Sequence, residues 1–154
     1  MATIKRRKRR RKNGRTSHYI TGVYTSTLTG QICKYRSGWE LKFMEFLDRS
    51  PFVKTWGYEK LVIQYLSNKK SGRMRKYYPD FKVEYLDDTV QVIEVKPSRR
   101  AKQATVVKKA MAAQEWCSAH SAVFVMITEI ELKVLGLLLI DLLVCIVDHN
   151  YLCR

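Results

Sequence analysis

Two acidic residues and a lysine in the middle of the chain have types and spacing suited to chemistry. Side chains alternate between faces along a strand, so Glu94 and Lys96 would share one face at the end of Thr89–Lys96. Asp80 lies 14 residues before Glu94. A turn at Asp87-Asp88 would bring the two carboxylates together across an antiparallel ladder. Because neighbouring carboxylates repel each other, the spacing predicts a site where a cation separates them.

That cation would be a hard divalent ion, because Mg²⁺ takes one or two carboxylates and keeps several waters. We expect Asp80 and Glu94 to bind Mg²⁺ or Mn²⁺, with the carbonyl oxygen of Val95 as a further ligand. Lys96 would orient or help deprotonate a metal-bound water and stabilise charge on a phosphate. Glu40, from a helix earlier in the chain, would add a third carboxylate. The set predicts a site where a metal-bound water acts on a phosphate.

Each of these residues also has an ordinary structural explanation. Ser37 and Glu40 have the spacing of a helix capping box, which needs no catalysis. Asp80 can simply follow a proline at the start of a strand. Glu94 and Lys96 can form an exposed ion pair, which adds little stability. The complete set of Asp80, Glu94 and Lys96 favours chemistry over these alternatives.

The elements that would position these residues include both helices and strands. Apolar residues recur at helical spacing over Ser37–Arg49, and Ser50-Pro51 ends this helix. Thr89–Lys96 is rich in the β-branched residues that favour strands. Further strands are expected at 61–66, 77–86 and 122–127, a basic helix at 99–119, and a helix after residue 127. The order predicts an α/β domain with a mixed β-sheet flanked by helices.

The net charge of +15 is concentrated at the N-terminal end. Residues 1–39 contain no acidic residue and carry +11, which leaves +4 for the rest of the chain. Such a segment repels itself and has little to bury, so we expect a disordered or extended basic arm that contacts nucleic acid. The alternatives are a solvated tail and a localisation signal. The arginines that we assign to DNA in this arm are Arg6, Arg7, Arg9, Arg10 and Arg11.

A second basic group follows the proposed site. We expect its side chains to position phosphates, although an ordinary solvated helix face explains them equally well. The residues are Arg99, Arg100, Lys102, Lys108 and Lys109. Lys69, Lys70 and Arg73, in a turn between strands, are weaker candidates of the same kind.

The termini complete the expected organisation. Residues 1–34 would form the arm and a connector, 35–132 the core, and 133–154 an apolar C-terminal helix. Val134–Val147 is too short to span a bilayer, so we expect no membrane role and a helix that packs either in the core or in the interface of a homo-oligomer. The four cysteines lack the spacing of a zinc site or disulfide framework. No secretory signal is visible, which predicts a non-secreted protein.

Three blocks of residues resemble the PD-(D/E)XK nuclease superfamily. Pro79-Asp80 followed by Glu94-Val95-Lys96 is similar to its signature, and Glu40 resembles the helical glutamate that often precedes it. Residues 35–44, 77–81 and 93–97 look like the blocks of TnsA-like transposase endonucleases and of head completion nucleases of T-even-type phages. Three blocks in the right order are more specific than the bare signature.

This resemblance implies a restriction-endonuclease-like fold and Mg²⁺-dependent hydrolysis of DNA, with catalytic Glu40, Asp80, Glu94 and Lys96. It further implies a role in finishing packaged phage heads, with phage head or portal proteins as partners. The expected location is then the host cytoplasm or the virion. Two alternatives stay open. One is a structural DNA-binding head or neck protein on a nuclease-like fold, and the other is a Holliday-junction resolvase that uses the same residues.

Overall fold

The computed structural model describes residues 9–10, 16–17 and 20–136. Helical residues 129–136 follow the last strand. The other elements, in chain order, are β1 (Arg9–Arg10), β2 (Thr16–Ser17), β3 (Gly22–Thr25), β4 (Ile32–Tyr35), α1 (Gly38–Arg49), β5 (Val53–Tyr58), β6 (Ile63–Asn68), β7 (Arg73–Tyr77), β8 (Phe81–Tyr85), β9 (Val90–Val95), α2 (Ser98–Ala101), α3 (Ala104–Ala119) and β10 (Val123–Ile127).

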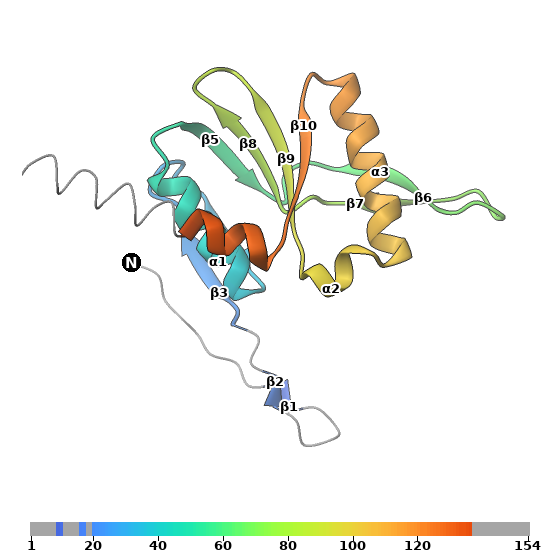
Figure 1. Cartoon of the computed structure of the whole chain (residues 1–154), viewed down its shortest axis with the longest axis horizontal. Helices are drawn as coiled ribbons and strands as arrows, with labels where there is room; N and C mark the ends of the chain where they lie inside the picture. Colours follow the sequence, from blue (N-terminus) through green and yellow to red (C-terminus); the bar gives the residue numbers. More distant parts are fainter. Residues whose placement is uncertain (1–8, 11–15, 18–19, 137–154) are drawn as a thin grey trace, which may run out of the picture.

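A four-stranded sheet of order β10-β9-β8-β5 forms the centre of the fold (Figure 1). β8 runs antiparallel to β5 and β9, whereas β10 runs parallel to β9. Phe124 of β10 packs in a cluster with α3 and β6–β7, while Val125 and Ile127 pack in the larger cluster with α1. Since alternate side chains of a strand point to opposite faces, the two helices cover opposite faces. The predicted mixed sheet flanked by helices is confirmed and is consistent with a restriction-endonuclease-like fold.

Helix α1 begins and ends where the sequence indicated. The Ser37 hydroxyl caps the helix by accepting a hydrogen bond from the Glu40 N–H at 3.2 Å. Phe43, Met44 and Leu47 are buried on the face that packs against the sheet. Ser50 ends the helix before Pro51, which cannot continue the backbone hydrogen bonding.

The β8–β9 hairpin has the register that the candidate site needs. Phe81 pairs with Ile93, so the next step of the ladder brings residue 80 opposite residue 94. The connecting turn at Asp87-Asp88 has a positive φ of 62° at Asp88, which Asp tolerates better than most residues. The predicted pairing across this turn is confirmed.

Two predicted elements are each divided in the structure. Of the expected strand at 77–86, Phe81–Tyr85 forms β8, whereas Tyr77 ends β7, a strand over Arg73–Tyr77 that the sequence did not indicate. The two are separated at 78–80, where Pro79 has no N–H to give to a ladder. The expected helix at 99–119 is α2 followed by α3, with a break at Lys102-Gln103. The break lets α3 pack against β6 and β10.

The connector predicted up to residue 34 is corrected by the structure. Residues 22–35 form the β3–β4 hairpin, whose Tyr24, Cys33 and Tyr35 are buried in the larger core cluster. Strand β5, which the sequence did not reveal, also contributes to this cluster. The folded body therefore begins earlier in the chain than the predicted boundary at residue 35.

Asp48, near the end of α1, ties this hairpin to the rest of the body. Its carboxylate accepts hydrogen bonds from the hydroxyls of Tyr24, Ser26 and Thr27, from the Thr27 N–H, and from the Trp56 indole N–H, most of them at 2.6–2.8 Å. Burial alone would raise the pKa of Asp48, but these hydrogen bonds lower it below its usual value. The network joins α1, the β3–β4 hairpin and β5.

We expect Asp48→Ala to lower the free energy of unfolding by about 3 kcal/mol, because it leaves several part-buried donors without an acceptor. Since the folded-state pKa is lowered, the stabilisation is present above the unfolded pKa of about 4 and is lost as the pH falls through the folded value. Urea unfolding at pH 7 measures the difference, with Glu45→Ala on the same helix as control. Equal stability of the two variants would contradict a structural role for Asp48.

Some predictions fall on parts of the chain outside the description. The side chains of Arg6, Arg7, Arg9, Arg10 and Arg11 and most of Val134–Val147 lie there. Among the helices that are described, none has both the length and the apolar composition needed to cross a membrane.

Candidate active site

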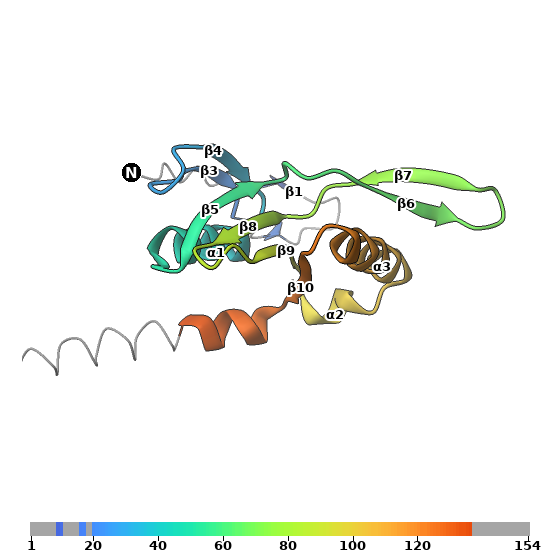
Figure 2. The ribbon, with the colours of Figure 1, turned by 90° about the horizontal axis from the view of Figure 1, so that it is seen from above.

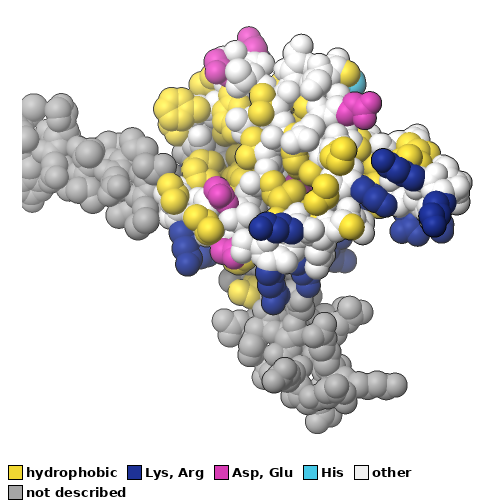
Figure 3. All heavy atoms as spheres, turned by 45° about the vertical axis from the view of Figure 1, so that its right-hand side comes forward, with side chains coloured by type: hydrophobic (Ala, Val, Ile, Leu, Met, Phe, Trp, Pro, Cys, Tyr) yellow, Lys and Arg dark blue, Asp and Glu magenta, His cyan; other side chains and the backbone are white. Residues whose placement is uncertain are grey.

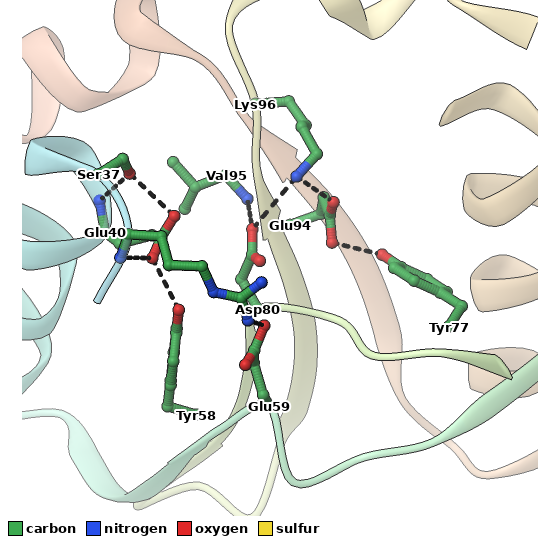
Figure 4. Close-up of polar contacts among 10 residues, drawn as sticks. Ser37, Glu40, Tyr58, Glu59, Tyr77, Asp80, Glu94, Val95 and Lys96 are labelled. Atoms are coloured by element: carbon green, nitrogen blue, oxygen red, sulfur yellow. Dashed lines mark hydrogen bonds and ion pairs between the residues drawn. The ribbon is translucent and has the colours of Figure 1, made fainter. Parts of the chain in front are cut away.

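The structure brings Asp80 and Glu94 together at the end of the β8–β9 ladder (Figure 4). Both residues are buried, with Asp80 7% and Glu94 3% exposed. Asp80 Oδ2 accepts a hydrogen bond from the Val95 N–H at 2.8 Å. Glu94 Oε2 accepts one from the Tyr77 hydroxyl at 2.6 Å. The backbone and a buried tyrosine therefore fix one oxygen of each carboxylate.

Lys96 supplies the positive charge beside this pair. Its Nζ lies 2.6 Å from Glu94 Oε1 and 3.9 Å from Asp80 Oδ2. The side chain is 28% exposed, so it reaches from the buried carboxylates toward solvent. Asp80, Glu94 and Lys96 thus form one cluster, as the spacing predicted.

The cluster holds two buried carboxylates for one nearby lysine. Burial first, and then the charge of Glu94, raise the pKa of Asp80 to about 7, against the opposing effects of Lys96 and the Val95 N–H. Burial alone would lower the pKa of Lys96, but the charges of Asp80 and Glu94 raise it above its usual value. The lysine stays charged, and within the described part of the chain it is the one cation that pairs with the two carboxylates.

Glu40 lies in the first turn of α1 and combines a capping role with a place near the cluster. Glu40 Oε1 accepts from the Ser37 hydroxyl at 2.9 Å, and Oε2 accepts from the Arg36 N–H at 2.8 Å and the Tyr58 hydroxyl at 2.7 Å. Its charge contributes to the raised pKa values of both Asp80 and Lys96. The capping explanation is therefore correct, and a metal-binding role for Glu40 stays a prediction.

The donor set of the cluster fits a divalent ion that keeps part of its water shell. Mg²⁺ binds through one or two carboxylates and retains several waters, and Asp80 with Glu94 meets that need. Within the described ranges, no three acidic, histidine or cysteine side chains gather into a metal cage. Glu40 therefore does not join the two carboxylates as a third ligand in this arrangement. The Val95 carbonyl stays a predicted ligand.

A groove of about 900 Å³ runs along this site, between α1 and α2. Its lining includes Glu40, Val95, Lys96, Arg99 and Arg100. Both arginines are exposed on the four-residue helix α2, next to the end of β9. The structure therefore places these two predicted cations beside the site, and their contact with phosphate stays a prediction.

The other predicted cations lie elsewhere. Lys102 is exposed at the end of α2. Lys108 donates a hydrogen bond to the Ser67 carbonyl at 2.8 Å, and the Lys109 Nζ lies 5.0 Å from the centre of the Tyr77 ring. These two lysines of α3 are half-buried and hold β6 and Tyr77 in place, so the structure does not bring them to the groove.

Two tyrosines that hold the acidic residues were missed by sequence reasoning. Tyr77 fixes Glu94 and Tyr58 fixes Glu40, and burial raises the pKa of both hydroxyls, so they remain donors. Tyr77 is the first residue of the 77–81 block, which was a usable signal. Tyr58 ends β5, a strand that the sequence did not indicate.

We expect Asp80→Asn to raise the melting temperature of the metal-free protein by about 3 °C or more, because it removes a buried charge beside Glu94. The amide oxygen still accepts from Val95. Since the folded-state pKa of Asp80 is raised, the stability of the metal-free wild type should fall as the pH rises from about 4 to about 7 and level off above that. The variant should lack this part of the slope.

Thermal melts in EDTA between pH 5 and pH 8 measure both effects. Glu84→Gln, at a partly exposed ion pair of β8, is the control and should change the melting temperature by about 1 °C or less. A lower melting temperature for Asp80→Asn would mean that the aspartate carboxylate stabilises the fold.

Comparison with known proteins decides the family of this chain. The family described as TnsA-like endonuclease N terminal matches residues 50–129, which is more than half of the chain. The chain belongs to this family. The matched residues include Asp80, Glu94 and Lys96, and they exclude Glu40.

A curated relative is also similar to part of the chain. It is the head completion nuclease of Enterobacteria phage T4, 38% identical over 65 residues. The match covers 42% of this chain and 43% of the relative, so the chain matches less than half the length of that protein. The predicted likeness to TnsA-like endonucleases and phage head completion nucleases is confirmed.

Proposed function

We propose that this chain is a metal-dependent DNA endonuclease that acts as a phage head completion nuclease. The observation that carries the proposal is the buried Asp80–Glu94 pair, with Lys96 in contact, beside a groove with two exposed arginines. A structural pair gains little from burying two carboxylates against one lysine, because desolvation opposes it. A site that binds a cation and a phosphate explains the arrangement.

The residues have separate roles in this proposal. Asp80 and Glu94, with the Val95 carbonyl, would hold Mg²⁺ or Mn²⁺, which supplies Lewis-acid polarisation of the phosphate and lowers the pKa of bound water. Lys96 donates to a phosphate oxygen and stabilises the charge that develops there. Arg99 and Arg100 position the DNA backbone along the groove. Tyr77 holds Glu94 in place through its hydroxyl.

The finer assignment rests on relatives. The relative from phage T4 is named a head completion nuclease, and it is 38% identical to this chain over 65 residues. We propose by analogy that DNA is the substrate and that phage head or portal proteins are partners.

A panel of DNA substrates tests the proposed activity. Supercoiled plasmid, linear duplex and an immobile four-way junction are incubated with wild type and with Glu94→Gln in Mg²⁺. We expect wild type to cut plasmid and linear duplex, and Glu94→Gln to cut at least about 10³-fold more slowly, as for other losses of a group that acts in the transition state.

Glu84→Gln is the matched control and should cut at the wild-type rate, since Glu84 pairs with Lys82 away from the groove. If the wild type cuts only the four-way junction, the chain is a Holliday-junction resolvase and the proposal is wrong. If the wild type binds DNA but cuts no substrate, the chain is a structural DNA-binding head protein instead.

A further inference from the structure

The β6–β7 hairpin projects from the body and extends past α3 (Figure 2). It forms its own two-stranded sheet, with Ile63 paired to Tyr77 at its base and Asn68 to Arg73 near its tip. From Leu61 to Tyr77 the chain contains no acidic residue. It carries five exposed cations, namely Lys69, Lys70, Arg73, Arg75 and Lys76.

These cations have no acidic partner within the described part of the chain. Figure 3 shows Lys and Arg side chains gathered over the projecting hairpin. A projecting element with five like charges repels itself, and it gains free energy when a polyanion replaces its counterions. The charge therefore fits a nucleic acid partner.

The hairpin has a fixed shape. The Asn68 side chain accepts from the Lys70 N–H at 2.9 Å, and Gly72 takes the positive φ of 63° that the turn requires. Lys108 of α3 donates to the Ser67 carbonyl at 2.8 Å, and Ile63, Tyr65 and Tyr77 pack against α3. A partner would therefore meet a preformed ribbon, which lowers the entropic cost of binding.

One face of the ribbon packs on α3, and the other is open. Because strand side chains alternate, Leu66 and Met74 lie directly opposite each other on the open face, 39% and 51% exposed. Gln64 and Lys76 form the next pair toward the base of the same face. The apolar Leu66–Met74 pair thus lies between the Gln64–Lys76 pair and the Asn68–Arg73 pair near the tip. Such a surface suits the floor of a DNA groove, which carries base edges and methyl groups.

The base of the ribbon joins the site directly. Tyr77, the last residue of β7, donates the hydrogen bond that fixes Glu94. From Tyr77 to Gly72 a strand extends about 17 Å, at about 3.3 Å per residue. Along duplex DNA this length corresponds to about five base pairs.

We infer that the β6–β7 hairpin is a DNA-binding ribbon that enters the major groove of the same duplex that the site cuts. The major groove admits a two-stranded β-ribbon. Lys69, Lys70 and Arg73 contact the phosphates at its edges, while the Leu66–Met74 face lies toward the bases. The inference rests on the proposed function and adds to it that the enzyme needs duplex DNA on one side of the cut.

Binding of a 30-base-pair duplex to the full chain in EDTA tests the ribbon without any cleavage. The variant is Lys69→Ala/Lys70→Ala/Arg73→Ala, which keeps Asn68 and Gly72 of the turn. The control is Arg49→Ala/Lys54→Ala/Lys82→Ala, which removes the same charge from residues that each pair with an acid on the body. Fluorescence anisotropy across a salt series gives affinity and its salt dependence, and melting curves confirm folding.

We expect the ribbon variant to bind at least about tenfold more weakly at 0.15 M salt, with a salt slope reduced by about 2–3. The control should stay within about threefold of wild type. Met74→Glu should also weaken binding about tenfold, because it places a negative charge on the open face of the ribbon. Leu86→Glu is the control and should not weaken binding, because Leu86 is exposed in the β8–β9 turn, at the end of that hairpin away from the site.

Equal binding by the two triple variants would overturn the ribbon, whatever the nuclease result. Loss of binding with Lys69, Lys70 and Arg73 replaced supports the ribbon even if the wild type cuts no DNA, in which case only the proposed function fails. A wild type that binds no duplex overturns both.

Discussion

Replacing Lys96 with alanine is expected to reduce DNA cleavage by at least about 10³-fold, while duplex binding changes by no more than about threefold. Lys96 is the cation that contacts both carboxylates and faces the groove, so its loss removes charge stabilisation at the phosphate. Binding depends mainly on cations elsewhere on the protein. The rate of plasmid nicking and the affinity in EDTA measure the two effects separately.

The same substitution leaves Asp80 and Glu94 without their lysine, so folding must be checked. We expect Lys96→Ala to be less stable than wild type in EDTA and to recover stability in Mg²⁺, because the ion restores positive charge between the carboxylates. Lys82→Ala is the control for loss of a lysine from an ion pair at the surface. A Lys96→Ala protein that is folded and cuts normally would contradict the assigned role.

Deleting residues 1–15 is expected to weaken duplex binding by at least about 100-fold at 0.15 M salt and to lower its salt slope by several units. This segment carries nine basic and no acidic residues. Each phosphate that it neutralises releases a counterion, so the loss appears mainly in salt dependence. Anisotropy of labelled duplex across a salt series measures the slope.

A variant with every arginine of residues 1–15 changed to lysine is the matched control. It keeps the charge, so we expect it to keep most of the salt slope, although arginine contacts phosphate more specifically. Cleavage at saturating protein should survive the deletion, since the acidic cluster lies in the folded body. An unchanged slope after deletion would show that the segment does not contact DNA.

The parts of the fold that the sequence predicted well have local signals. Ser37 and Ser50-Pro51 mark the ends of α1, and the β8–β9 register follows from the short turn at Asp87-Asp88. That register was enough to place Asp80 beside Glu94. Since Glu94 and Lys96 alternate correctly on one strand, the cluster could be predicted without knowledge of the remaining fold.

The missed elements depend on distant contacts. In β5 a register shift between Val53 and Thr55 interrupts the alternation that marks a strand. The β3–β4 hairpin is rich in polar residues, and its buried Ser26 donates a hydrogen bond to Asp48, 22 residues away. No short sequence pattern indicates a hydrogen-bond partner so far away in the chain.

Glu40 and the basic helix show the same limit at the site. The capping spacing of Glu40 is local, but its link to Tyr58 is not, so the sequence alone did not separate its two roles. Lys108 and Lys109 look like solvated cations in the sequence. In the structure they contact Ser67 and Tyr77, because α2 and α3 diverge at a break that neither Gly nor Pro marks.

The most direct test of the proposed nuclease is plasmid cleavage with Mg²⁺, with Mn²⁺ and with EDTA, comparing wild type with Asp80→Asn. We predict nicked or linear product with either metal, none in EDTA, and none from Asp80→Asn, which should still bind DNA. Cleavage that persists in EDTA or in Asp80→Asn would contradict a metal-dependent site built on Asp80 and Glu94.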